Sequence, residues 1–67
     1  MKVKYDPEVD VLSIMLSEFP VEESDESKPG IILDCDNAGN VVALEILNAS
    51  KRMDNPMSVE YAIARWP

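Results

Sequence analysis

The sequence predicts a mainly β fold, with a mixed α+β fold as the alternative: an antiparallel meander sheet of four to five strands built from two hairpins. Apolar and polar residues alternate over 1–16 and again over 31–47, which is the period-two pattern of strands with one covered face. Turn-forming residues interrupt both stretches. Because the chain has 67 residues, we expect one small domain, with a core at 1–49 and a C-terminal tail at 50–67.

The first hairpin is predicted over residues 1–16. Val3 and Tyr5 share one face of the first strand, and Leu12, Ile14 and Leu16 share one face of the second. The segment between them, residues 6–10, contains Asp and Pro, which favour a turn because Asp bonds the nearby backbone and Pro fixes its own φ. We therefore expect one apolar side on this hairpin.

Residues 17–29 form an acidic segment with five acids and one Lys. Such charge runs are usually solvated, so we expect a loop with a short edge strand at 21–24 whose charges discourage edge-to-edge association. The alternative is that the segment binds a partner. In that case Phe19 is the apolar anchor, and the acids that attract the partner are Glu22, Glu23, Asp25 and Glu26.

The second hairpin is predicted over residues 31–47. Asp36 opens the turn and Gly39 is free to adopt a positive φ. Cys35 is in step with the apolar residues of its strand, so we expect a small buried side chain and not a reactive thiol. The expected core of the two hairpins comprises Ile14, Leu16, Leu33, Leu44 and Ile46.

The tail fits two patterns. Val59, Tyr61 and Ile63 alternate as in a strand, whereas Asn55-Pro56 is typical of a helix start, so residues 57–66 are predicted as either a strand or a short helix. Trp66 is expected either at the rim of the core or as an anchor in an interface.

Composition excludes several classes of protein. The net charge of −7 disfavours direct binding of nucleic acid, because phosphates require the opposite sign. The chain has no His, which excludes a histidine-based catalytic triad and the commonest zinc ligand. Its one Cys cannot form a disulfide within the chain. No apolar run approaches the length of a membrane span. We therefore expect a soluble cytoplasmic protein. A compact chain of this mass has an accessible surface of about 4,200 Å². The apolar area that so small a chain buries barely offsets the entropy lost on folding, so a homodimer or higher assembly is expected.

The sequence blocks also resemble a known family. They run from Tyr5-Asp6 and Asp10 through the acidic segment and Pro29-Gly30 to residues 45–50, and in this order they are similar to a family of short prokaryotic proteins catalogued as domain of unknown function 2283. The resemblance implies a small β-rich protein and supplies no activity, cofactor or catalytic residue. Genes of such proteins often lie beside a short toxin-like partner, which implies an antitoxin-like role toward a basic protein.

The residues fit two other functions in part. Residues 34–45 have the spacing of a calcium loop at Asp34, Asp36, Gly39 and Glu45, but Ala38 supplies no side-chain oxygen and both flanks are strands rather than helices. Paired carboxylates for a small enzyme occur at Asp6/Asp10, Asp34/Asp36 and Glu22/Glu23, but a single sheet offers little of the cleft that such catalysis needs. We therefore expect a non-enzymatic protein-interaction module, and we assign no cofactor, metal ligand or catalytic residue.

Overall fold

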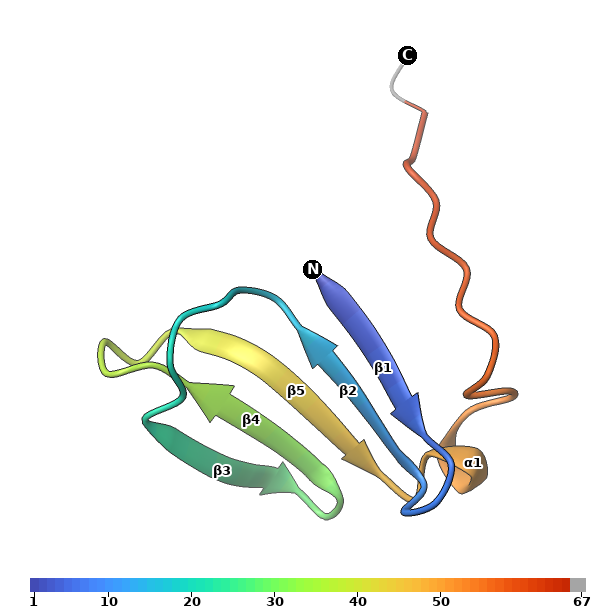
Figure 1. Ribbon diagram of the computed structural model, residues 1–67, viewed down its shortest axis with the longest axis horizontal. Helices are drawn as coiled ribbons and strands as arrows, with labels where there is room; N and C mark the ends of the chain where they lie inside the picture. Colours follow the sequence, from blue (N-terminus) through green and yellow to red (C-terminus); the bar gives the residue numbers. More distant parts are fainter. Residues whose placement is uncertain (66–67) are drawn as a thin grey trace.

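One antiparallel sheet makes up most of the computed structural model, which describes residues 1–65 (Figure 1). Its five strands are β1 (Lys2–Asp6), β2 (Val11–Met15), β3 (Glu23–Lys28), β4 (Ile31–Cys35) and β5 (Val41–Leu47), and one helical turn, α1 (Ala49–Arg52), follows the last strand. This architecture confirms the predicted mainly β class.

The order of the strands is β1-β2-β5-β4-β3, so the predicted meander order is wrong at one point. β1–β2 and β3–β4–β5 each form a local antiparallel unit, but β2 pairs with β5 and not with β3. The physical reason is the composition of the strands. All six residues of β3 are polar and exposed, whereas β5 is apolar on both faces and gains most from a central place.

The register separates the sheet into two faces. On the face that we call the apolar face, side chains opposite one another form two rows across four strands, and each row ends in a charged residue of β3. These rows are Val3-Ile14-Leu44-Leu33-Asp25 and Tyr5-Leu12-Ile46-Ile31-Lys28. The other face, the polar face, carries the rows Lys4-Ser13-Glu45-Ile32-Glu26 and Lys2-Met15-Ala43-Asp34-Ser24.

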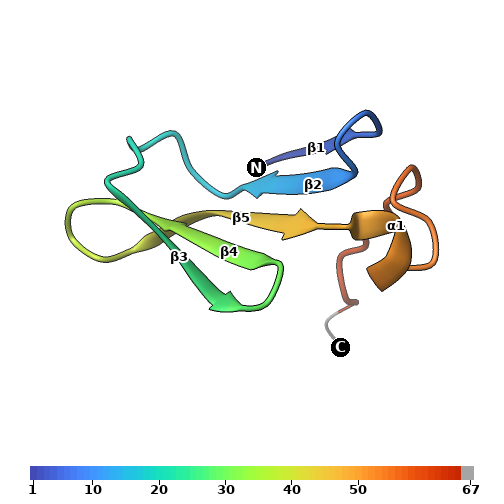
Figure 2. The same ribbon diagram turned by 90° about the horizontal axis from the view of Figure 1, so that it is seen from below.

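No second layer packs on this sheet within residues 1–65 (Figure 2). Every pair of elements in extensive contact consists of neighbouring strands. The buried apolar residues of the sheet and α1 are accordingly few: Leu12, Val42, Ala43 and Ala49.

The expected core residues are therefore less buried than predicted. Ile14, Leu33, Leu44 and Ile46 are half-buried. Leu16 is 45% exposed, and its assignment to the core is wrong. It follows the last residue of β2, where it is not covered by a facing layer. Cys35 is a free, half-buried thiol.

The predicted turns are present. Asp36 accepts hydrogen bonds from the N–H groups of Ala38 (3.0 Å) and Asn40 (2.9 Å), and Gly39 has φ +83°. The hydrogen bond from the Asn40 backbone is the largest cause of a lowered pKa at Asp36. The hydrogen bonds of this turn therefore favour the charged form of the carboxylate.

The tail differs from both predictions. The one described helix is α1 at residues 49–52, and residues 57–65 form neither a strand nor a helix. They run away from the sheet beyond β1 (Figure 1). A strand needs a hydrogen-bonded neighbour and a short helix needs a packed face, and this segment has neither among residues 1–65. Trp66 lies outside the described residues. Among the residues described, no helix has the length and apolarity to cross a membrane.

Candidate partner-binding surface

The predicted partner-binding residues lie in two adjoining parts of the chain. Phe19 and Glu22 belong to the linker between β2 and β3 (residues 16–22), and the other three acids, Glu23, Asp25 and Glu26, belong to β3. All five residues are exposed. The expected loop with a strand at 21–24 is wrong in extent, because the strand runs from Glu23 to Lys28. An exposed polar edge strand has no apolar alternation that would mark its ends in the sequence.

The acids of β3 flank a free strand edge. β3 is the last strand in the sheet order, so one of its edges has no neighbour among the described strands. Asp25 lies opposite Leu33 and Glu26 lies opposite Ile32, which places their side chains on opposite faces of the sheet. Negative charge is therefore present above and below the same row of free backbone groups.

Glu26 has an additional structural role. Its carboxylate accepts a hydrogen bond from the N–H of Gly30 (2.8 Å), and the guanidinium of Arg52 donates to the carbonyl oxygen of Pro29 (2.6 Å). Gly30 has φ +80°. The turn between β3 and β4 is thus held both by its own strand and by α1.

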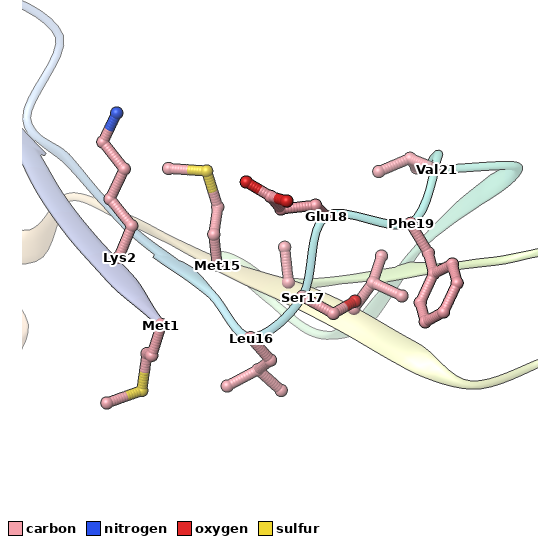
Figure 3. A pocket seen from close by; sticks show the side chains of 10 residues that line it. Met1, Lys2, Met15, Leu16, Ser17, Glu18, Phe19 and Val21 are labelled. Carbon is pink, nitrogen blue, oxygen red and sulfur yellow. The ribbon is translucent and has the colours of Figure 1, made fainter.

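The linker borders a shallow groove of about 660 Å³ (Figure 3). Met1 and Leu16 point to one side of the sheet, whereas Lys2 and Glu18 point to the other. The residues that line the groove therefore lie on both sides of the sheet, at the end that the linker crosses. Phe19 lines this groove and is 66% exposed. Its ring is available to a partner at the same end of the molecule at which β3 begins.

Asp10 connects the first turn to α1. Its carboxylate accepts hydrogen bonds from the Tyr5 hydroxyl (2.7 Å), the Ser50 hydroxyl (2.7 Å) and the Ser50 N–H (2.9 Å). The hydrogen bond from the Ser50 hydroxyl, followed by that from Tyr5, lowers the pKa of Asp10. Hydrogen bonding to Asp10 in turn raises the pKa of Tyr5. The predicted turn residue therefore also binds a helix 40 residues away, a contact without a local sequence signal.

The predicted pair Asp6/Asp10 is consequently divided between two local tasks. Asp6 accepts the N–H of Glu8 within the turn (3.0 Å), while Asp10 serves α1. Asp36, predicted as a partner of Asp34, is bonded within its own turn. These carboxylates stabilise turns and a helix start.

Asp34 and Glu45 come together on the polar face. Asp34 is buried and accepts a hydrogen bond from the Ser24 hydroxyl (2.5 Å). A hydrogen bond to Asp34, partial burial and the negative charge of Asp34 raise the pKa of Glu45, in that order. The two ends of the calcium-like spacing are thus neighbours on adjacent strands. No cluster of three or more Asp, Glu or Cys side chains suited to a metal ion is found within residues 1–65.

Comparison with known proteins places the chain in a family. Neither the curated proteins nor the solved structures gave a significant match. The family described as "Protein of unknown function (DUF2283)" matches residues 2–50. This segment contains all five strands and both ends of the contact between Asp10 and Ser50, and it leaves out the extended tail. The chain therefore belongs to the DUF2283 family, as the resemblance of its sequence blocks predicted.

Proposed function

We propose that this protein is a non-enzymatic interaction module that binds a basic protein through the free edge of β3 and the adjoining linker, as an antitoxin-like partner does. The observation that carries the proposal is β3 itself: an edge strand of six exposed residues with acidic side chains on both of its faces. Five acids and one Lys in residues 17–29 concentrate much of the net negative charge at this edge.

The geometry supports binding by addition of a strand. An extended segment of the partner pairs with the free backbone groups of β3, which supplies affinity through main-chain hydrogen bonds. Basic side chains that alternate along that segment meet Asp25 on one face and Glu26 on the other. The negative field of this edge accelerates the encounter, and Phe19 contributes an apolar contact beside it.

The test uses the protein encoded by the adjacent gene as the partner. The two proteins are co-purified, and their association rate is measured by stopped-flow fluorescence at low and high salt. The variant is the triple substitution E22Q/E23Q/D25N, which leaves Glu26 and its bond to Gly30 in place. We expect association to slow by about tenfold or more and to lose most of its salt dependence, because steering depends on these charges.

The matched control is E8Q/D54N/E60Q, which removes the same charge from exposed positions outside β3 and the linker. Its association rate is expected to stay within about twofold of wild type. Equal association rates for the two triple variants would contradict the proposal. Faster aggregation of the first variant without slower binding would instead assign the β3 acids to protection of the edge.

A further inference from the structure

The chain exposes more surface than a compact protein of its mass. Its accessible surface is 5523 Å², which is about 1,300 Å² above the ~4,200 Å² expected for a compact chain of 7.5 kDa. Its radius of gyration is 13.2 Å, against about 11 Å for a compact domain of this length. The fold therefore leaves an area uncovered that is large for so small a protein.

Uncovered apolar surface lies in two adjoining places that concern a partner. The first is the apolar face, on which the two rows carry eight residues over four strands without an interior charge. Val3 is exposed, Leu12 is buried and the other six are half-buried. The second is the extended tail (residues 57–65), in which large apolar side chains stand at every second position from Met57 to Ile63 and are exposed. The exposed fractions there are 75% for Met57, 59% for Val59, 74% for Tyr61 and 83% for Ile63.

The tail begins at the apolar face. Pro56 is buried, and Met57 and Val59 line a hollow of about 370 Å³ together with Val3, Tyr5 and Leu12. Beyond this point the segment leaves the sheet past β1 (Figure 1). Its alternation suits a strand or a strip of apolar contacts, but no part of the described chain receives it.

We infer that a second copy of this chain covers the apolar face, and that the tail of each copy contributes Tyr61 and Ile63 to the interface. A stable dimer buries about 800 Å² on each partner, and the whole chain exposes more than that amount in excess of a compact chain of its mass. The same face on two copies is self-complementary around a two-fold axis.

Charge also favours a second copy. The net charge of −7 opposes self-association in general, but the charges of these two rows stand only at the β3 end, as Asp25 and Lys28. The acids of β3 thus stay at the rim of a face-to-face pair, where solvent screens them. A basic or acidic protein partner would find no charge to recognise at the centre of this face.

The first test is the molar mass of the full chain in solution. Light scattering and sedimentation velocity at 10 and 100 µM are expected to give twice the mass of 7.5 kDa. A monomer at both concentrations, or an assembly larger than a dimer, overturns the inference. This measurement needs no substitution and is independent of how a variant folds.

The second test addresses the tail. Y61D/I63D places two charges on the apolar side of the tail, and A62D/A64D places the same charges on its other side. All four positions are exposed in the single chain, so neither variant is expected to change the fold of the sheet. We expect the first to raise the dimer dissociation constant by at least about tenfold and the second by less than about threefold. If both variants change the dimer dissociation constant equally, or if neither changes it, the tail is not part of the interface.

The third test addresses the sheet faces. Val3→Lys adds a charge to the apolar face at a position 38% exposed, and Ser13→Lys adds the same charge to the polar face of the neighbouring strand. Circular dichroism checks that both variants remain folded. Val3→Lys is expected to weaken the dimer by about tenfold or more, because its charge would be buried without a partner. Weakening by Ser13→Lys alone would move the interface to the polar face and overturn the inference.

Discussion

Replacement of Gly30 by Ala offers a test of the contact between α1 and the β3–β4 turn. Gly30 has φ +80°, and a Cβ atom there would meet the guanidinium of Arg52. The left-handed backbone costs an alanine about 1 kcal/mol. Arg52 must also move, which breaks its hydrogen bond to the carbonyl oxygen of Pro29 at a further cost of about 1 kcal/mol. We expect Gly30→Ala to lose about 2 kcal/mol in all.

Gly39 supplies the control. It has φ +83°, but a Cβ atom there would meet nothing within 4 Å, so Gly39→Ala is expected to lose only the backbone cost of about 1 kcal/mol. Urea unfolding followed by circular dichroism, at one fixed protein concentration, measures both losses. With a slope of about 1 kcal/mol per molar urea, the midpoints fall by about 2 M and about 1 M.

Arg52→Ala completes a double-mutant cycle. In that background the two glycine substitutions are expected to cost the same, because the side chain that distinguishes them is absent. A larger loss for Gly30→Ala that persists without Arg52 would refute the assignment of the difference to this contact. Equal losses in the wild-type background would refute it as well.

The remaining predictions concern two half-buried carboxylates, Asp10 and Glu45. Asp10→Asn is expected to lower the urea midpoint at pH 7 and to speed amide hydrogen exchange at Ser50, since the carboxylate binds this N–H and the Tyr5 hydroxyl. Because the pKa of Asp10 is lowered by folding, its stabilisation is present at neutral pH and is lost as the pH falls below about 4, so the variant and wild type converge in acid. Glu45 has the opposite sign: folding raises its pKa beside Asp34, so its contribution is fully present in acid and is lost as the pH rises through the folded pKa. Glu45→Gln is therefore expected to be at least as stable as wild type at pH 7 and less stable than wild type below about pH 4. Urea unfolding at both pH values measures this difference.

The sequence predicted those parts of the fold that depend on neighbours along the chain. The turn at Asp36 and the hairpin around it could be predicted, because the residues that determine the turn, Asp36, Gly39 and Asn40, lie within five residues of one another. Period-two alternation likewise identified β1, β2, β4 and β5. The tail shows the limit of the same method, since alternation at Val59 and Tyr61 predicts a strand only if a neighbouring strand exists.

The rest could not be predicted because it depends on contacts between distant residues. α1 is a single turn whose start is held by Asp10, across 40 residues of sequence, and no capping residue precedes it: Asn48 makes no side-chain cap. β3 has six exposed polar residues and pairs because β4 offers an edge. The candidate surface was predicted in part, because the acids are visible in the sequence. The placement of these acids on two faces of an edge strand is not visible in the sequence, because it follows from the register of β3 with β4.

The strand order has a consequence for how the chain folds. β1–β2 and β3–β4–β5 each form from residues close in sequence, and among the described strands only the pairing of β2 with β5 joins the two units. That pairing closes a loop from Val11 to Leu47, whose entropy must be lost before the contact is gained. During synthesis, the outer edges of both β1 and β2 are therefore expected to have no paired neighbour until β5 has left the ribosome. The slow step of folding is expected to be this docking of two preformed units.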